Sequence, residues 1–390
     1  MKVFLIAGEA SGDVLGAALM AGLKKHQPDV TFLGVGGAQM EAEGMQSLFP
    51  MHELSVMGLA EVLPKYRHLK RRIAQTAEAA IAAQPDVLIS IDSPDFCLRV
   101  AKLVKAGSTV RTVHYVAPSV WAWRPKRADK MARVIDHVLA LLPFEPPYME
   151  AAGTACDFVG HPAASIPVVA EAEKQAFRAR HDVAEANPLL LVLPGSRRGE
   201  VKRLGPRIGQ ALEPVVARHP QLRVVLPAAR NVVDQVREVT SAWPVAPVIL
   251  DPTGQPVAQA ETEKRIAFAA ADFALATSGT VALELAAADT PMVSVFDLNW
   301  LSREIIKRMV RVDTGNLINL VTDTRTVPEF VGENCVPNKI GAGVMDLIRD
   351  ASAQRQAMAD CMDALGRGGV PPGERAALAV LKRMGVQQLP

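Results

Sequence analysis

The segment Ala271-Asp272-Phe273-Ala274-Leu275-Ala276-Thr277-Ser278-Gly279-Thr280 predicts a short apolar strand that ends in a hydroxyl-rich turn. A helix is expected to follow, with Glu284 one turn inside it. Free backbone N–H groups at such a helix start can bind a phosphate, with help from the helix dipole. The Glu284 carboxylate can accept hydrogen bonds from two neighbouring hydroxyls, such as those of a ribose. The segment therefore favours a nucleotide diphosphate site; the alternative is a capped helix whose Glu284 faces solvent.

A second turn suited to an anion follows the continuous apolar run 189–193, which is typical of a buried parallel strand. The turn contains Gly195, Ser196 and Arg197, so it offers backbone N–H donors and a guanidinium that can hold a phosphate through two hydrogen bonds. An ordinary strand-to-helix loop with solvated arginines is the alternative for this turn alone. Because both turns lie in the same half of the chain, together they favour one bound diphosphate.

Strand-like apolar runs alternate with helical segments along the whole chain, and each gap between runs is long enough for a crossover helix. The expected strands are 2–7, 30–35, 86–91, 110–116, 136–142, 156–159, 189–193, 222–226, 247–250, 272–276 and 291–295. This alternation predicts an α/β fold with two Rossmann-like domains, each on a doubly wound parallel sheet, facing each other across a cleft. Ligands are then expected at the carboxyl ends of the strands.

The domain boundaries follow from length and from one linker. A chain of 390 residues is long for a single core. The segment 160–167 is rich in proline and small residues, which is typical of a linker. We expect an N-terminal domain at 1–165, a second domain at 166–345, and C-terminal helices at 346–390 that pack back on the first domain.

Composition narrows the function classes. A net charge of +2 carries no signature of a nucleic-acid-binding protein. No segment approaches the roughly 18 apolar residues of a membrane-spanning helix, so a soluble or peripheral protein is expected. The cysteines are far apart in sequence and lack CxxC spacing, so reduced thiols are expected and neither disulfides nor a metal site. They are Cys97, Cys156, Cys335 and Cys361.

The first loop of the chain, after the strand 2–7, is acidic. It lacks the Gly-x-Gly-x-x-Gly spacing of dinucleotide-binding proteins, and Glu9 would repel a pyrophosphate. This argues against an oxidoreductase and favours binding of hydroxyl groups, as on a sugar. Ser11 or Asp13 is expected to cap the helix that follows.

Asp92 is expected at the carboxyl end of a central strand, where α/β enzymes present catalytic groups. A carboxylate there can act as a general base on a hydroxyl. The alternative is that Asp92 or Ser93 caps the helix that starts near Pro94.

Aromatic and basic residues alternate after the strand 110–116. Trp121 and Trp123 can stack on sugar faces, and Arg124, Lys126 and Arg127 can bind a phosphate. Nucleic-acid binding uses similar surfaces, but this segment is short. Core packing of the two tryptophans is the other alternative.

A helix expected at 64–83, with Pro64 in its first position, has one apolar face and one basic face. An apolar loop precedes it. A basic helix beside an apolar loop is typical of a membrane-surface contact, and a solvated charged face is the alternative. The residues expected to contact the membrane are Met57, Leu59, Val62, Leu63, Lys65, Arg67, Arg71 and Arg72.

A set of motifs resembles the lipid-A-disaccharide synthase family, occurs in the family's order and covers nearly the whole chain. The tryptophan motif is the most specific of them. The motifs are Gly8-Glu9-Ala10-Ser11-Gly12-Asp13, Val56-Met57-Gly58, Ile91-Asp92-Ser93-Pro94-Asp95-Phe96, His114-Tyr115-Val116-Ala117-Pro118-Ser119-Val120-Trp121-Ala122-Trp123-Arg124, Leu142-Pro143-Phe144-Glu145, Gly160-His161-Pro162, Leu193-Pro194-Gly195-Ser196-Arg197, and Ser278-Gly279-Thr280 through Glu284.

The resemblance implies a GT-B glycosyltransferase of Gram-negative outer-membrane biogenesis. Such an enzyme transfers a 2,3-diacylglucosamine unit from UDP to 2,3-diacylglucosamine 1-phosphate (lipid X). The reaction inverts the anomeric centre, forms a β-1,6-linked disaccharide and releases UDP. The resemblance further implies no metal and no cofactor, a peripheral position on the cytoplasmic face of the inner membrane, and a homodimer that exchanges its C-terminal helices.

Carried over residue by residue, the resemblance makes Asp92 the general base for the acceptor 6-hydroxyl and Glu9 the acidic residue of the first loop. It places the donor UDP at Ser196, Arg197, Ser278, Gly279, Thr280, Glu284, Asn316 and Asn319. It places the acceptor at Ser11, Trp121, Trp123 and Arg124. Two positions depart from the family pattern: Ile318 stands where a proline is usual, and Ser165 where an acidic residue is common.

Two other functions fit part of the pattern. A related GT-B enzyme, such as a UDP-N-acetylglucosamine transferase or 2-epimerase, would share the nucleotide-binding half but would not need the basic helix and apolar loop. A noncatalytic nucleotide-sugar-binding protein at the membrane would keep the loops but would have no use for Asp92 as a base.

Overall fold

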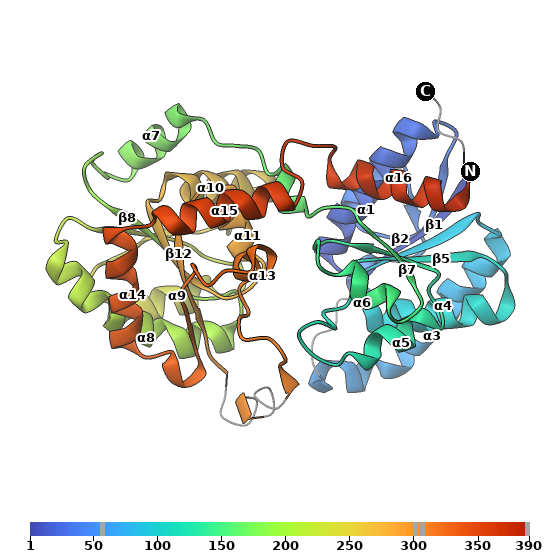
Figure 1. Cartoon of the computed structure of the whole chain (residues 1–390), viewed down its shortest axis with the longest axis horizontal. Coiled ribbons are helices and arrows are strands. Elements are labelled where there is room, and N and C mark those ends of the chain that lie inside the picture. The colour runs from blue at the N-terminus through green and yellow to red at the C-terminus, as the bar shows by residue number, and fades with distance from the viewer. Residues whose placement is uncertain (55–58, 299–302, 305–308, 387–390) are drawn as a thin grey trace. The chain divides into compact units, whose positions relative to one another are not determined.

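The computed structural model describes residues 1–54, 59–298, 303–304 and 309–386, with only the backbone described for 59–66. The chain forms two compact units (Figure 1). The first unit contains Met1–Ser165 together with Leu365–Pro390, and the second contains Ile166–Ala364. Each unit is an α/β layer structure around its own parallel sheet.

The first unit holds a seven-stranded sheet in the order β3-β2-β1-β4-β5-β6-β7. Its strands are β1 Lys2–Ala7, β2 Thr31–Val35, β3 Gln46–Ser47, β4 Val87–Ile91, β5 Arg111–Tyr115, β6 His137–Ala140 and β7 Ala155–Phe158. Its helices are α1 Ala10–His26, α2 Ala38–Ala42, α3 Leu59–Ala83, α4 Pro94–Gly107, α5 Lys126–Ala132, α6 Pro146–Glu150 and α16 Pro372–Met384. Every neighbouring pair of strands is parallel, so the loops that follow the strands, which carry the candidate residues, all lie on the side of the sheet where the strands have their carboxyl ends.

The second unit holds a six-stranded parallel sheet in the order β10-β9-β8-β11-β12-β13. Its strands are β8 Leu189–Leu193, β9 Arg223–Pro227, β10 Val248–Leu250, β11 Phe273–Thr277, β12 Met292–Phe296 and β13 Glu329–Val331. Its helices are α7 Glu171–Arg180, α8 Arg198–Arg218, α9 Val233–Thr240, α10 Val257–Ala270, α11 Val281–Ala287, α13 Leu317–Thr322, α14 Pro337–Arg349 and α15 Ser352–Ala364. The central strands are buried on both faces, as their continuous apolar sequences predict.

The C-terminal helices divide between the units. Helix α15 packs against α11 and α13 in the second unit, while α16 packs against α1 in the first. The contact between α16 and α1 is close, because a Cβ at Gly373 would lie 2.6 Å from the backbone of Ala18. Ion pairs lie near the two ends of α16: Glu374 pairs with Lys25 of α1 at 2.8 Å, and Arg383 pairs with Asp157 of β7 at 2.9 Å. The segment that returns to the first unit is therefore shorter than the expected 346–390.

One predicted helix start was wrong. Helix α3 begins at Leu59, so Pro64 lies inside the helix and not in its first position. Among the described helices, none is long and apolar enough to cross a membrane.

Candidate active site

The carboxyl ends of β1, β4 and β5 bring two carboxyl groups together in the first unit. Ala7 pairs with Ile91, and Ile91 pairs with Tyr115, so these three strands end at the same level. Glu9 follows β1 and Asp92 follows β4. Burial raises the pKa of Glu9, and the negative charge of Asp92 raises it further. The two predicted catalytic carboxyl groups are therefore close enough for the charge of one to change the pKa of the other.

Just after these strands, three residues other than glycine have a left-handed backbone conformation. The φ angle is +51° at Asp92, +43° at Ser93 and +87° at Val116. Such a conformation costs roughly 1–3 kcal/mol per residue and is a genuine outlier for a β-branched valine. The loops also approach closely, since a Cβ at Gly8 would lie 2.5 Å from the Oγ of Ser93. Strain of this kind is retained mainly where function requires it.

Helix capping explains only one of the polar residues of these loops, Asp13, and the helix that its side chain caps is α2, not α1. The N-cap residue of α1 is Glu9, not Ser11 or Asp13, so that expectation was wrong. Asp13 is buried and accepts hydrogen bonds from three backbone N–H groups at the start of α2. Ser11 is exposed on the first turn of α1. Ser93 is the N-cap residue of α4, without a capping bond from its side chain.

The two tryptophans of this segment are both half-buried and differ in their contacts. Trp121 donates a hydrogen bond of 3.3 Å to Glu145 and packs edge-on against Phe144. The guanidinium carbon of Arg124 lies 4.3 Å from the centroid of the Trp123 ring, and the guanidinium carbon of Arg127 lies 5.6 Å from it. Local contacts therefore hold Trp121 in place, while Trp123 and Arg124 present an aromatic and cationic surface suited to a sugar phosphate.

Glu145 gives a prediction for pH dependence. The carboxyl accepts hydrogen bonds from Trp121 and from two backbone N–H groups, yet burial raises its pKa to about 7. Because the folded protein holds this proton more tightly than the unfolded chain, the stabilising contribution is complete at low pH. It falls by about 3 kcal/mol as the pH rises through the range from about 4.5 to 7. Glu145→Gln is expected to flatten this part of the stability curve.

The measurement is urea unfolding of both proteins at several pH values between about 5 and 8. The variant is also expected to be less stable overall at low pH, because an amide offers one acceptor oxygen to three donors. Identical slopes of stability against pH in the two proteins would show that Glu145 does not titrate in this range.

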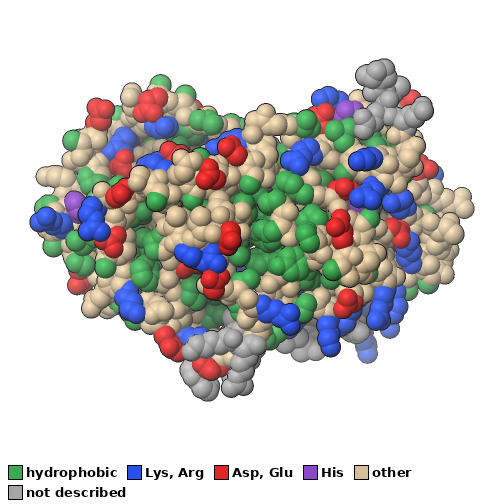
Figure 2. Space-filling view, viewed as in Figure 1, with side chains coloured by type: hydrophobic (Ala, Val, Ile, Leu, Met, Phe, Trp, Pro, Cys, Tyr) green, Lys and Arg blue, Asp and Glu red, His purple; other side chains and the backbone are tan. Residues whose placement is uncertain are grey.

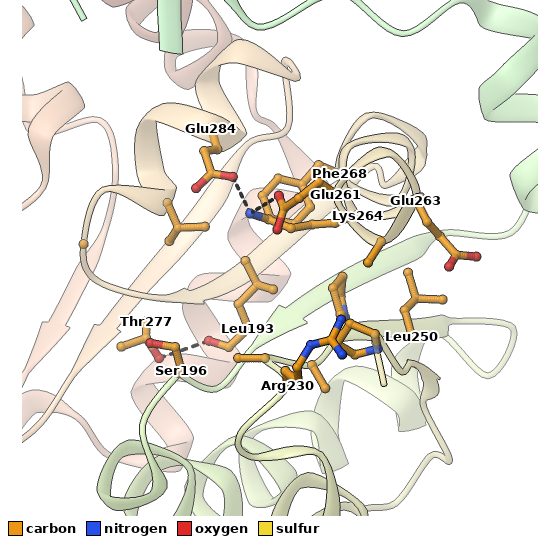
Figure 3. A pocket seen from close by; sticks show the side chains of 18 of the residues that line it. Leu193, Ser196, Arg230, Leu250, Glu261, Glu263, Lys264, Phe268, Thr277 and Glu284 are labelled. Carbon is orange, nitrogen blue, oxygen red and sulfur yellow. Dashed lines mark hydrogen bonds and ion pairs between the residues drawn. The ribbon is translucent and has the colours of Figure 1, made fainter. Parts of the chain in front are cut away.

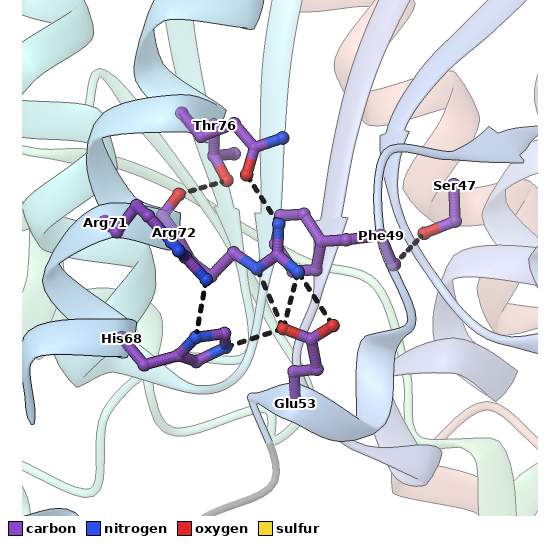
Figure 4. A network of polar contacts seen from close by, with 8 residues as sticks. Ser47, Phe49, Glu53, His68, Arg71, Arg72 and Thr76 are labelled. Carbon is purple, nitrogen blue, oxygen red and sulfur yellow. Dashed lines mark hydrogen bonds and ion pairs between the residues drawn. The ribbon is translucent and has the colours of Figure 1, made fainter. Parts of the chain in front are cut away.

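Some of the basic side chains of helix α3 bond to other residues of the protein and do not simply face solvent (Figure 4). Arg72 donates to both carboxylate oxygens of Glu53 at 2.8 Å and lies 4.3 Å from the centroid of the Phe49 ring. His68 also bonds to Glu53, at 2.6 Å, and Arg71 contacts His68 at 3.0 Å. These hydrogen bonds lower the pKa of Glu53. Arg72 therefore anchors α3 to the preceding loop and is not available to a membrane surface.

The other predicted membrane residues are only partly described. Met57 lies outside the described residues, as do the side chains of Leu59, Val62, Leu63 and Lys65. Arg67 and Arg71 are exposed, and so is Lys70, which the sequence interpretation omitted. Figure 2 shows lysine and arginine side chains gathered at the lower edge of the first unit, over the region labelled α3, α4 and α5 in Figure 1.

The second unit contains a pocket of about 680 Å³ at the carboxyl ends of four neighbouring strands (Figure 3). Leu193, Pro227, Leu250 and Thr277 mark the ends of β8, β9, β10 and β11 in its wall. The sequence-predicted residues that line it are Ser196, Arg197, Ser278, Gly279, Thr280 and Glu284. The two turns proposed for one diphosphate therefore do meet in space.

The turn after β8 contains a carboxylate of the protein itself, that of Glu200. Gly195 has φ +117°, which turns the following backbone N–H groups toward the side chain of Glu200. Glu200 accepts hydrogen bonds from the N–H groups of Ser196 at 3.1 Å and Arg197 at 3.3 Å, and pairs with the Arg197 guanidinium at 3.1 Å. A carboxylate thus occupies donors that suit a phosphate. Helix α11, by contrast, has only seven residues, so its dipole adds little at the turn after β11.

Glu284 has a partner that sequence reasoning missed. The Nζ of Lys264, from α10, lies 2.7 Å from a carboxylate oxygen of Glu284 in the wall of the pocket. In Figure 3 this pair lies beside Glu261 and Phe268, apart from Ser196 and Thr277. Lys264 belongs to a charge-rich stretch, 261–265, whose pattern is that of any solvated helix face.

Two predicted donor residues lie outside the pocket. Asn316 and Asn319 are buried and absent from its lining. Asn316 caps α13 by accepting from the N–H of Ile318, and Asn319 bonds with both the N–H and the carbonyl of Val327. They hold the loop that passes close to Ser278, since a Cβ at Gly315 would lie 3.9 Å from the Oγ of Ser278. Both asparagines therefore hold this loop in place from outside the pocket lining. The departure at Ile318 is fully buried, and Ser165 ends a short 3₁₀ helix.

Within the described residues, no group of three or more His, Cys, Asp or Glu side chains is arranged to hold a metal ion. The four cysteines are buried free thiols.

Comparison with solved structures identifies the fold. Staphylococcus aureus MnaA in complex with UDP matches with a TM-score of 0.65 at 14% identity, covering 99% of this chain and 97% of that one. The UDP-GlcNAc 2-epimerase of Neisseria meningitidis matches with a TM-score of 0.64 at 12% identity, covering 99% and 100%. At this identity the likeness establishes the fold alone, which is shared by GT-B glycosyltransferases and UDP-GlcNAc 2-epimerases. The predicted fold class is confirmed.

Comparison with known sequences identifies the family. The family model for lipid-A-disaccharide synthetase matches residues 3–371. The lipid-A-disaccharide synthase of Ruegeria pomeroyi is 61% identical over 384 residues, which is 98% of this chain and 96% of that protein. The enzyme of Rhodospirillum centenum is 46% identical over 386 residues, 98% and 94% respectively. The chain therefore belongs to the lipid-A-disaccharide synthase family, the bacterial glycosyltransferases that condense UDP-diacylglucosamine with lipid X in lipid A biosynthesis.

Proposed function

We propose that the two units of this enzyme divide its two substrates between them. The second unit binds the UDP part of the donor, with Arg197 and the backbone of Ser196 and Ser278–Thr280 at the diphosphate and Glu284 at the ribose. The first unit binds the acceptor and supplies the base. The observation that carries this proposal is the pocket in which both anion-suited turns and Glu284 come together at the ends of four parallel strands.

In the proposed reaction Asp92 accepts the proton of the acceptor 6-hydroxyl as that oxygen attacks C1 of the donor sugar. The bond from C1 to the β-phosphate oxygen breaks, and its electron pair leaves with UDP, so the configuration at C1 inverts and a β-1,6 linkage forms. Arg197 balances the charge that develops on UDP. Glu9, whose pKa is raised, is suited to share a proton with an acceptor hydroxyl beside Asp92. Ser11, Trp123 and Arg124 offer polar and aromatic contacts to the acceptor. The scheme uses neither a metal nor a cofactor.

Glu284→Ala tests the donor site. The variant is expected to bind UDP about tenfold or more weakly, because it loses hydrogen bonds between ribose and a charged group. Isothermal titration calorimetry with UDP measures this. Glu213→Ala is the matched control, because Glu213 is an exposed glutamate on α8 outside the pocket. Parental affinity in Glu284→Ala would place the ribose elsewhere.

We further propose that the enzyme binds peripherally to the cytoplasmic face of the inner membrane through α3 and the apolar loop before it. Both substrates carry acyl chains, and exposing each CH₂ group to water costs about 0.8 kcal/mol. An enzyme at the interface leaves these chains in lipid. The exposure of Arg67, Lys70 and Arg71 on one helix supports this proposal, while the half-buried ion pair of Arg72 with Glu53 removes Arg72 from it.

The membrane proposal predicts that Arg67→Ser/Lys70→Ser/Arg71→Ser reduces co-sedimentation with anionic liposomes and its salt dependence. Each cation near an anionic surface contributes about 1 kcal/mol. Turnover on vesicle-borne substrate should fall, while turnover on short-chain soluble analogues should remain. The control is Arg218→Ser/Arg223→Ser/Lys339→Ser, which removes three exposed cations from the second unit. Equal sedimentation of parent and α3 variant would leave Arg124, Lys126 and Arg127 as the basic surface to test next.

We also propose a homodimer in which the C-terminal helices are exchanged. The resemblance to the family supports this, and the position of α16, which reaches the first unit after a connection at 365–371, makes an exchange geometrically simple. Light scattering on the eluting peak of a size-exclusion column distinguishes a dimer from a monomer.

A further inference from the structure

Lys264 is a cation of the nucleotide pocket to which the proposed reaction gives no task. Its Nζ lies 2.7 Å from Glu284 Oε2, 3.4 Å from Glu261 Oε2 and 5.5 Å from the centroid of the Phe268 ring (Figure 3). The side chains of Lys264 and Glu284 are 31% and 35% exposed, so the pair is half-buried in the pocket wall. Lys264 also lies on a different helix from Glu284, which makes the pair a link between α10 and α11.

The contacts on α10 hold the ammonium group in place. A free lysine side chain samples many rotamers, but Glu261 is one turn away on the same helix and Phe268 lies beneath the ammonium. Burial lowers the pKa of Lys264, the charges of Glu284 and Glu261 raise it, and the net shift is upward. The group therefore stays charged and directed at Glu284.

A charged, held ammonium also fixes the carboxylate that it contacts. Each carboxylate oxygen accepts more than one hydrogen bond, so Glu284 keeps acceptor capacity for ribose hydroxyls while one oxygen contacts Lys264. A carboxylate that is already oriented loses little conformational entropy when a ligand arrives. An analogue without the 2′-hydroxyl then leaves one charged acceptor unpaired, and this weakens its binding about tenfold or more relative to the ribose form.

We propose that Lys264 is a positioning residue that orients Glu284 toward the ribose diol and so sets the preference for ribose over 2′-deoxyribose in the donor. The inference rests on the proposed function, in which Glu284 contacts the ribose. Without Lys264 the Glu284 side chain is free to turn toward solvent, and the two nucleotides bind with similar affinity.

The test is calorimetry of the full-length enzyme with UDP and with 2′-deoxy-UDP. The parent is expected to prefer UDP by about tenfold or more. Lys264→Met is expected to reduce this ratio to about threefold or less. Lys264→Arg, which keeps a positive charge beside Glu284, is expected to retain most of it. Lys174→Met is the matched control, because Lys174 pairs with Glu171 on α7, away from the pocket.

The outcomes separate this inference from the proposed function. An undiminished ratio in Lys264→Met would overturn the positioning role, whether affinity is unchanged or falls equally for both nucleotides, as loss of a diphosphate contact would produce. Glu284→Ala should itself abolish the preference; if it does not, the ribose contact of the proposed function is misplaced. Thermal unfolding checks each variant, and Glu261→Gln, which loosens the same ammonium, replaces Lys264→Met if that variant does not fold.

Discussion

Asp92→Asn is expected to lower kcat by about 10²–10⁴-fold, the usual contribution of a general base, while UDP affinity stays at the parental value. The amide keeps the shape of the carboxylate but cannot take the acceptor proton. Asparagine also tolerates the left-handed backbone that this position requires, at φ +51°. The substitution therefore removes the chemistry without adding strain. Release of UDP from the donor in the presence of the acceptor measures turnover, and calorimetry with UDP measures binding.

Asp95→Asn is the matched control for this experiment. Asp95 is exposed in the first turn of α4, so the variant makes the same chemical change three residues further along the chain. It is expected to retain parental turnover. The Asp92 variant has a second readout: because the charge of Asp92 helps to raise the pKa of Glu9, its removal should lower the titration midpoint of Glu9. Near-parental turnover in Asp92→Asn would remove Asp92 from the role of base.

The sheets were predictable because their strands are buried on both faces. Runs such as Leu189–Leu193 and Val87–Ile91 contain only residues that a parallel sheet buries, and turns of glycine, serine and aspartate end them. Every expected strand is present. The two strands that sequence reasoning missed, β3 and β13, are short and lie at sheet edges, where two or three residues show no periodicity.

The positions of the site loops were also predictable from the sequence, but the ion pairs between side chains were not. Parallel strands all end at one edge of the sheet, so residues just after β8 and β11 had to lie close together. Charged residues on helices gave no such constraint. Arg72 bonds to Glu53, 19 positions away, and Lys264 bonds to a residue on another helix. Both belong to charge-rich stretches that would have the same sequence pattern if they were fully solvated.

Arg197→Ala is expected to weaken UDP binding by about 10- to 100-fold, since a charge-assisted hydrogen bond to phosphate contributes roughly 1.5–3 kcal/mol. The affinity of the variant should also depend less on salt, because a cation facing the diphosphate is gone. Arg198→Ala is the matched control: Arg198 is the next residue, is also exposed, and is absent from the pocket lining. Calorimetry at two salt concentrations measures both effects, and unchanged affinity and salt dependence would move the diphosphate away from this turn.

Glu200 offers a second test of the diphosphate site, because its carboxylate occupies the backbone N–H groups of Ser196 and Arg197 that the diphosphate would use. Arg197 is 70% exposed in its pair with Glu200, and so exposed a pair contributes little stability and is exchanged at low cost. Glu200→Gln is therefore expected to bind UDP at least as tightly as the parent, which is the opposite of the change in Arg197→Ala. In the double variant the two effects should not add, since both act through one guanidinium and one pair of backbone N–H groups. Weaker UDP binding in Glu200→Gln would instead mean that the carboxylate holds the turn in its binding shape while UDP is bound.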